Sequence, residues 1–248
     1  MNGTGGPGEH PVIAAGPAAH GPGTGRDEVL AVLGSERLLP VVVLEDAARA
    51  MPLAQALVAG GLHTIEVTFR TAAAEDAIRA VAGLPGLLVG AGTVRTPEQV
   101  ERAVAAGARF VVSPGLSLPV VRRCRELGVP TFPGVATPTE IQRATEEGLD
   151  VLKLFPAGQL GGARATAALA APFAEVRFVP TGGVSQTDLA DYLRLPSVLA
   201  VGGTWMVAAD LVRAGDWAEI TRRTAEAVAL VRGAGSSAGS RTAAEVRP

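Results

Sequence analysis

The feature that most constrains the fold is an alternation of short apolar runs with helix-forming segments along most of the chain. The runs recur at intervals of roughly two dozen residues, and apolar runs of this length, bounded by turn residues, are typical of buried strands. There are eight candidates: Leu38–Leu44, His63–Phe69, Leu87–Thr93, Arg109–Ser113, Val129–Val135, Val151–Pro156, Arg177–Gly182 and Val198–Thr204.

Segments rich in Ala, Glu, Arg and Leu, such as Ala47–Ala59 and Pro97–Ala106, separate these runs. Strands that alternate with helices favour a parallel sheet with helical crossovers. Eight such units in a row favour closure into a barrel over an open doubly wound sheet, and a (β/α)8 barrel usually needs about 250 residues. The chain has 248. We therefore predict an α/β fold, a (β/α)8 TIM barrel.

Helix boundaries are marked by capping residues. Thr96 and Thr137 each place a hydroxyl before a first-turn proline, which is a start signal. Glycines stand where four helices should stop, namely Gly60, Gly107, Gly128 and Gly148. An extra helix is expected over Asp27–Ser35, ahead of the first strand, where it would cover the bottom of the barrel.

The two ends of the chain differ in composition from the barrel. Residues 1–26 are rich in Gly, Pro, Ala and Thr, and such a segment buries too little apolar surface to offset its ordering entropy. We predict a disordered leader there, a barrel domain over 27–232, and a flexible tail over 233–248.

Composition excludes several classes of function. The formal net charge of −2 argues against a nucleic-acid footprint, and no apolar run is long enough for a membrane span. The N-terminus has no basic stretch followed by an apolar one, so we expect no secretory signal. Because Cys124 is the single cysteine, the chain has no internal disulfide, which suits a reducing cytoplasm. Cys124 lies in a helix-like stretch, where we expect it to be a packing residue. Only His63 among three histidines lies in the folded region, so we expect no metal site and no cofactor.

The 22 basic residues are 21 arginines and a single lysine, Lys153. A chain so biased towards arginine tolerates replacement of surface lysines, so the remaining one should do something that arginine cannot. A neutral lysine amine is a nucleophile, whereas arginine stays protonated. Strand alternation points Lys153 into the barrel, opposite to Leu152 and Leu154, where a structural lysine would need a carboxylate partner. We predict that Lys153 forms a Schiff base with a carbonyl substrate.

The second strand supplies a partner for this chemistry. Glu66, Thr68 and Arg70 share one face of the strand. A Schiff-base reaction needs a proton shuttle, for which Glu66 is suited, although a structural pair with Arg70 is the alternative. Arg70, at the end of the strand, can hold an anionic group through a bidentate contact.

Other strand ends carry residues suited to ligand binding. Gly90-Ala91-Gly92-Thr93 would allow close approach of a ligand, with the Thr93 hydroxyl as a donor. Pro114 and Pro133 shape either the pocket wall or merely turns. Thr181-Gly182-Gly183 and Gly202-Gly203-Thr204 end the last two strands, whose loops often bind phosphate in barrels.

Taken in order, these motifs resemble the 2-keto-3-deoxy-6-phosphogluconate (KDPG) aldolase family, also called 4-hydroxy-2-oxoglutarate (KHG) aldolase. The resemblance covers about residues 39–231. It is carried by Ile65-Glu66-Val67-Thr68-Phe69-Arg70-Thr71, Val89-Gly90-Ala91-Gly92-Thr93, Ser113-Pro114-Gly115, Lys153-Leu154-Phe155-Pro156-Ala157, Pro180-Thr181-Gly182-Gly183-Val184 and Gly202-Gly203-Thr204-Trp205.

The resemblance implies a role for each matched residue. Lys153 would be the Schiff-base lysine and Glu66 the general acid/base. Arg70 and Thr93 would hold the substrate carboxylate, and Pro114 and Phe155 would line the pocket. Thr181 would contact the sugar acid. The phosphate site would be formed by Gly182, Gly183, Gly203 and Thr204. It also implies a metal-independent homotrimer that splits KDPG into pyruvate and glyceraldehyde 3-phosphate, the carbon-cleaving step of the Entner–Doudoroff route.

Two positions depart from the family pattern. Thr204 stands where serine is common, so its methyl group could tighten the phosphate end. Phe69 replaces a usual leucine on the face that points away from the site, which implies only repacking.

Three alternatives remain. An aldolase for the galactonate epimer, or for unphosphorylated KHG, shares the mechanism, and the resemblance implies that Thr181 favours the gluconate-derived substrate. A sugar-phosphate isomerase or epimerase barrel would usually want metal ligands, which the histidine count disfavours. A barrel that only binds phosphate ligands would not need Lys153.

Overall fold

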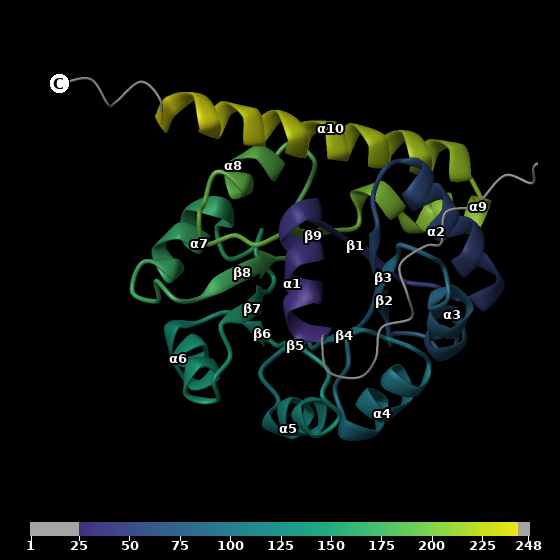
Figure 1. The fold of residues 1–248 in the computed structure, drawn as a ribbon, viewed down its shortest axis with the longest axis horizontal. Coiled ribbons are helices and arrows are strands. Elements are labelled where there is room, and N and C mark those ends of the chain that lie inside the picture. The colour runs from purple at the N-terminus through teal and green to yellow at the C-terminus, as the bar shows by residue number, and fades with distance from the viewer. Residues whose placement is uncertain (1–24, 243–248) are drawn as a thin grey trace, which may run out of the picture.

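Parallel strands form a closed barrel in the computed structural model, which describes residues 25–242, with side chains up to residue 234. Figure 1 shows the strands at the centre of a ring of helices. The strands are β1 (Leu38–Val42), β2 (Thr64–Thr68), β3 (Leu88–Gly92), β4 (Phe110–Val112), β5 (Thr131–Phe132), β6 (Gly134–Val135), β7 (Val151–Leu154), β8 (Arg177–Pro180) and β9 (Val201–Gly203). Every predicted run contains a strand, and the predicted barrel is confirmed.

The barrel closes through two irregular places. One run of pairings has the order β5-β4-β3-β2-β1-β9 and the other the order β6-β7-β8. Strands β5 and β6 are two halves of the fifth barrel strand, separated at Pro133, which has no N–H to give to a ladder. Between β8 and β9 the contact is made by two isolated bridges, Phe178 to Val198 and Thr181 to Gly202.

The helices lie outside the strands and follow them in order, as Figure 1 shows. They are α2 (Ala50–Ala59), α3 (Ala74–Val81), α4 (Pro97–Ala105), α5 (Leu118–Glu126), α6 (Pro138–Glu146), α7 (Gly162–Ala170), α8 (Leu189–Leu193) and α9 (Ala209–Ala214), with short 3-10 turns η1 (Ala47–Arg49) and η2 (Trp205–Val207). Thr96 and Thr137 cap α4 and α6, the latter through a capping box with Glu140. The predicted cap signals are confirmed.

Helix α1 (Gly25–Glu36) lies across the end of the barrel where the strands begin (Figure 1). Its residues Val29 and Leu33 are fully buried against the lower interior of the barrel, in a cluster that includes Phe110 and Val179. The predicted extra helix therefore forms and covers the barrel bottom. A second, larger apolar core fills the space between the strands and the outer helices.

Helix α10 (Trp217–Thr242) packs along α2 and α8 at the edge of the barrel (Figure 1). It continues past Arg232, where the sequence predicts that the barrel domain ends, so the first ten residues of the predicted tail are helical. Residues 1–24 of the predicted leader lie outside the described residues. No helix in the described part of the chain is both long and apolar enough to cross a membrane.

Candidate active site

Lys153 and Glu66 meet inside the barrel. The Nζ atom of Lys153 lies 3.4 Å from Oε1 of Glu66, and the two residues are 4% and 1% exposed. They come from β7 and β2, which are not neighbours in the sheet, so the contact crosses the barrel interior. A buried charge is costly unless it is paired, and each residue supplies the partner that the other needs.

Strand alternation sets this arrangement, as predicted. Leu152 and Leu154 pack into the outer core, which turns Lys153 inward. In the same way, Ile65 and Val67 face the helices and turn Glu66 inward. The alternative considered for Glu66, an ion pair with Arg70, does not form, because Arg70 is exposed while Glu66 faces Lys153.

Two glycines of β3 make room for these side chains. A Cβ atom on Gly92 would lie 2.1 Å from Oε1 of Glu66, and one on Gly90 would lie 2.1 Å from the ring of Phe110. The sequence predicts that these glycines allow close approach of a ligand; in the structure, Gly92 makes room for the Glu66 carboxylate and Gly90 for the Phe110 ring. Any larger residue at position 92 would displace Glu66.

Phe155 links the lysine to the loop after β8. Its ring centroid lies 5.3 Å from the Nζ atom of Lys153, within the range of a cation–π contact. A Cβ atom on Gly182 would lie 2.8 Å from the same ring. Gly182 has φ +87, a left-handed conformation that glycine adopts without strain. Both the backbone conformation and the closeness of the Phe155 ring therefore favour glycine at this position.

The loops after β7 and β8 are tied together. The backbone N–H groups of Ala157 and Gly158 donate to the carbonyl groups of Thr181 and Gly182, at 2.9 and 2.8 Å. The N–H groups of Gly182 and Gly183 have no acceptor among the described residues. They are therefore available for an anion at this end of the barrel.

The remaining predicted residues lie at the carboxyl ends of the strands, where Thr181 and Gly203 are buried and four others are on the rim. Arg70 and Thr204 are exposed, whereas Thr93 and Pro114 are half-buried. Thr93 has φ +56, which is uncommon for a residue with a β-branched side chain. Such outliers occur most often where a functional site fixes the backbone.

Glu66 can handle a proton as well as pair with the lysine. Its second oxygen, Oε2, is buried and has no hydrogen-bond partner among the described residues. A buried acceptor of this kind normally has a partner, so it is available to a substrate hydroxyl or a bridging water. A lysine, a carboxylate with a free oxygen and an anion-binding loop can together support carbonyl chemistry on an anionic substrate.

A family model described as KDPG and KHG aldolase matches residues 29–223, which is most of the chain. The chain belongs to the KDPG and KHG aldolase family. The resemblance predicted from the sequence is confirmed, and with it the class of enzyme: a carbon–carbon lyase that works through a Schiff base.

Individual relatives agree with the family assignment. The chain is 50% identical to 2-dehydro-3-deoxy-phosphogluconate aldolase of Treponema pallidum, over 79% of this chain and 93% of that one. It is 46% identical to KHG/KDPG aldolase of Escherichia coli, again over 79% and 93%. The fold also matches a crystal structure of KDPG aldolase from Legionella pneumophila, in which pyruvate is captured as a covalent carbinolamine intermediate. The TM-score is 0.77 at 38% sequence identity, and the match covers 80% of this chain and 97% of that one.

Family membership also fits the residues that take no part in the site. Cys124 is fully buried, and burial raises the pKa of its thiol to about 11, as expected of a packing residue. His63 lies beside Glu36 at 3.1 Å, at the bottom of the barrel. Phe69 packs into the outer core, as the departure from the family pattern implies. Among the described residues, His, Cys, Asp and Glu form no group of three that could hold a metal ion.

Sequence reasoning missed the loop between β7 and α7. Gly158 lies against Gly183, since a Cβ on it would be 2.3 Å from the Gly183 carbonyl oxygen. The amide of Gln159 contacts the other side of Gly183, where a Cβ would lie 2.7 Å from it. The glycine-rich run 158–162 was the signal that could have indicated this close packing of two loops.

Proposed function

We propose that this chain cleaves KDPG into pyruvate and glyceraldehyde 3-phosphate. The observation that carries the proposal is the buried contact of Lys153 with Glu66 inside a closed barrel. The loop after β8, which contains Gly182 and Gly183, and the end of β9 at Gly203 would supply an anion site at the same end of the barrel. The relatives named above for activity on KDPG support the choice of substrate.

The first half of the reaction makes the Schiff base. Glu66 takes a proton from the Lys153 ammonium, and the free amine then attacks the C2 carbonyl carbon of KDPG. The carbinolamine that forms loses its hydroxyl group as water, with Glu66 returning the proton, and an iminium ion remains. The 3.4 Å separation of the two groups allows transfer directly or through one water.

The second half breaks the carbon–carbon bond. Glu66 removes the proton of the C4 hydroxyl, the C3–C4 bond cleaves, and its electron pair moves into the iminium to give an enamine. Glyceraldehyde 3-phosphate leaves, the enamine is protonated at C3, and water hydrolyses the resulting iminium to pyruvate and free Lys153. The buried Oε2 of Glu66 is the oxygen available to face the substrate.

Rim residues hold the two ends of the substrate in this proposal. Arg70 and Thr93 bind the carboxylate next to the reacting carbonyl, as a guanidinium fork and a hydroxyl donor can do. Pro114 and Phe155 form apolar walls, and the 5.3 Å contact with Lys153 supports the latter role. Thr181 contacts the hydroxyl groups of the sugar acid.

The phosphate binds where the last two barrel strands end. We assign it to the N–H groups of Gly182 and Gly183 together with Gly203 and Thr204. The lack of acceptors for the first two N–H groups supports this assignment. Thr204 is exposed at the end of β9, where its hydroxyl can donate to a phosphate oxygen.

Cleavage of KHG to pyruvate and glyoxylate is a second candidate activity. The E. coli relative named for both substrates supports it. KHG lacks a phosphate, so it would use Lys153, Glu66 and Arg70 but gain nothing from Gly182 and Gly183. We therefore expect a lower kcat/KM for KHG than for KDPG.

Comparison of kcat/KM for KDPG, its galactonate epimer and KHG tests the proposal. We expect KDPG to be cleaved fastest, with pyruvate and glyceraldehyde 3-phosphate formed in equal amounts. A Thr204→Asp variant should lose KDPG cleavage selectively and keep KHG cleavage, because the added carboxylate repels the phosphate. Faster cleavage of the galactonate epimer would contradict the substrate assignment.

We also infer that the chain works as a homotrimer in the cytoplasm. The resemblance to homotrimeric aldolases supports the first point, and the single cysteine Cys124 supports the second. Light scattering coupled to gel filtration tests the assembly, with a mass of three chains as the expected result and a monomer as the contrary one.

A further inference from the structure

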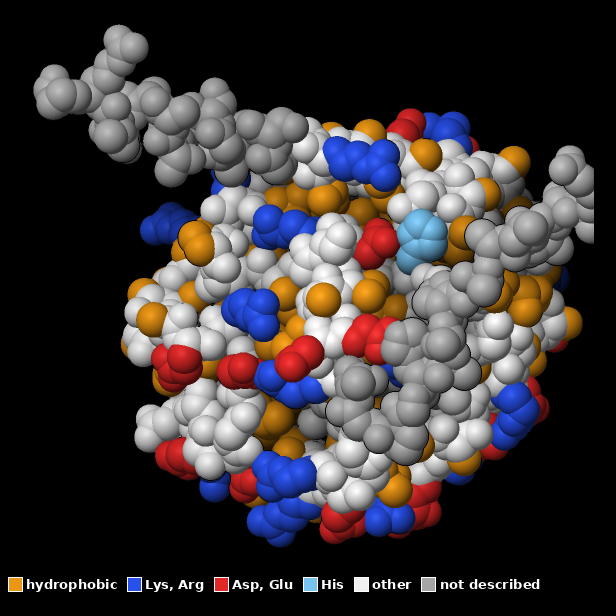
Figure 2. Space-filling model, in the orientation of Figure 1, with side chains coloured by type: hydrophobic (Ala, Val, Ile, Leu, Met, Phe, Trp, Pro, Cys, Tyr) orange, Lys and Arg blue, Asp and Glu red, His pale blue; other side chains and the backbone are white. Residues whose placement is uncertain are grey.

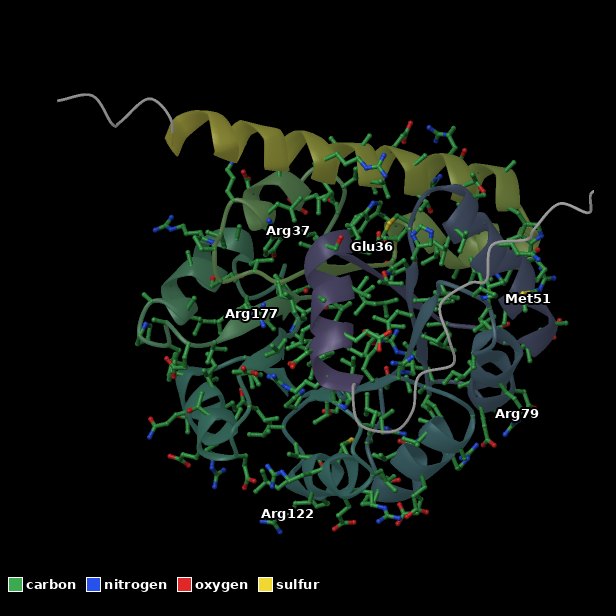
Figure 3. All side chains as sticks on the ribbon, in the orientation of Figure 1. Glu36, Arg37, Met51, Arg79, Arg122 and Arg177 are labelled. Carbon is green, nitrogen blue, oxygen red and sulfur yellow. The ribbon has the colours of Figure 1, made fainter. Side chains whose placement is uncertain are left out.

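A hollow of about 410 Å³ lies at the opposite end of the barrel from Lys153, where strands β8 and β9 begin. Arginines at positions 37, 177 and 194 line it, together with apolar residues that include Leu195 and Val198. Figure 3 labels Arg37 and Arg177 on the same side of α1, and Figure 2 shows blue side chains in those places with orange apolar side chains beside them. This hollow is called the basal pocket below.

The basal pocket is positively charged. Its lining contains arginines and no carboxylate. Arg194 pairs with Asp191 at 2.6 Å, but both side chains are largely exposed. Among the described residues, the guanidinium of Arg177 has no ion pair or hydrogen bond, and that of Arg37 contacts a carbonyl group only. Two positive charges therefore lack a counter-charge in the pocket.

Other arginines at the same end of the barrel are paired. Arg109 lies 2.8 Å from Glu28 of α1, and Arg26 contacts Asp150. Carboxylates are thus available on the elements around the barrel bottom, yet none lines the basal pocket. Arg177 therefore differs from Arg26 and Arg109 in having no carboxylate partner among the described residues.

Arg37 is held in a fixed position. It follows α1 with φ +54, a left-handed conformation that is unfavourable for a residue with a side chain and is normally taken by glycine. Its guanidinium donates to the carbonyl of Val198 at 2.9 Å, and burial lowers the pKa of the group. An arginine at this position is therefore both strained and partly desolvated, as in a preorganised anion site.

The shape of the basal pocket narrows the class of ligand. A volume of this size falls within the range of small-molecule sites, roughly 300–1,000 Å³. Guanidinium groups bind phosphate and carboxylate through paired hydrogen bonds. Leu195 and Val198 offer an apolar surface for a short carbon chain. Gly34 of α1 also lines the pocket and packs closely on Leu199, since a Cβ there would lie 3.3 Å from that side chain.

We propose that the basal pocket is a second ligand site, which binds a small phosphorylated carboxylic acid through Arg37 and Arg177. One arginine takes the phosphate and the other the carboxylate. The site is separate from the proposed active site, which lies at the other end of the strands. Arg37 precedes β1 and Arg177 begins β8, so a bound ligand spans the place where β8 and β9 join by isolated bridges only. Binding should therefore stabilise the folded chain.

Titration calorimetry of the full chain with 3-phosphoglycerate tests the proposal. Because the glycine loops near Lys153 can also take a phosphate, the wild type should bind two molecules per chain. Arg177→Ser should bind one and keep its kcat/KM for cleavage, whereas Thr204→Asp should lose the other molecule and keep the basal one. For Arg177→Ser we expect the affinity of the basal pocket for 3-phosphoglycerate to fall by at least tenfold. The loss should be smaller for Arg177→Lys, which keeps the positive charge but not the paired N–H donors of the guanidinium.

Matched variants separate this site from general charge effects and from misfolding. Arg122→Ser removes an exposed arginine of α5, which lies at the lower edge of the view in Figure 3, away from Arg37 and Arg177, and this variant should bind both molecules. Arg37→Asn should lose the basal molecule without unfolding, because asparagine accepts the left-handed backbone. Inorganic phosphate and glycerate, each given alone, should bind the basal pocket at least tenfold more weakly. Equal stoichiometry in the wild type and Arg177→Ser, or equal weakening by Arg122→Ser, would overturn the proposal.

Discussion

The Nζ atom of Lys153 lies 3.4 Å from Oε1 of Glu66, and both side chains are almost completely buried in the barrel interior. The pair joins the middle of β2 to the middle of β7, and Gly92 leaves the space that Glu66 occupies. One contact therefore pairs two buried charges and, in the proposed mechanism, sets a proton acceptor beside the nucleophile. The predictions below follow from that double role.

Glu66→Gln should keep the shape of the carboxylate and lose its proton chemistry. We expect kcat for KDPG cleavage to fall by about 100- to 10,000-fold, the usual contribution of a positioned acid or base. Solvent exchange of the pyruvate methyl protons, followed by NMR in deuterium oxide, should slow by a similar factor. A variant that retains wild-type exchange would show that another group moves the proton.

Removing one member of the buried pair should destabilise the fold more than removing both. Lys153→Met alone leaves Glu66 without a counter-charge, which should lower the free energy of unfolding by about 3–5 kcal/mol. Combining it with Glu66→Leu should recover most of that loss, because apolar groups then fill the space. Urea unfolding of the two single variants and the double variant measures the coupling, and strictly additive effects would contradict it.

Arg70→Lys should separate substrate binding from chemistry. The exposed side chain takes no part in the core, so the melting temperature should stay within the wild-type range. Lysine cannot reproduce the paired hydrogen bonds of a guanidinium, so KM for KDPG should rise by about tenfold or more. Steady-state kinetics give the result, and an unchanged KM would remove Arg70 from the carboxylate site.

Cys124 should make stability fall at alkaline pH. Because burial raises the pKa of this thiol to about 11, the folded state holds the proton more tightly than the unfolded state. The resulting contribution to stability is fully present below the unfolded pKa of about 8.5 and is lost as pH rises towards about 11. Urea unfolding at pH 8 and pH 10 measures the loss, and Cys124→Ala is the control that should lack this component. Rapid reaction of native protein with a thiol reagent at pH 8 would contradict the burial.

The barrel and the inward direction of Lys153 could be predicted because both depend on local pattern. Alternation within Val151–Leu154 decides which side of the strand faces the core, and eight similar units leave few topologies. The partnership with Glu66 could be inferred only from chemical need, since 87 residues separate the two in the chain.

Other features depend on contacts that form only when the barrel closes. The sequence shows Gly90 and Gly92 but not the ring and the carboxylate that fill the space beside them. It does not show that Pro133 divides the fifth strand. Helix α10 also runs past the glycine-rich boundary at 232, because a helix already started can continue through weak helix formers.

The most direct test of the account is reduction with borohydride in the presence of pyruvate, followed by mass spectrometry of the intact chain and of its peptides. We predict that the chain gains the mass of one reduced pyruvyl group, attached to Lys153, and that Lys153→Met gains nothing. Absence of an adduct on the wild type, or an adduct on any other group, would contradict the assignment of Lys153 as the nucleophile.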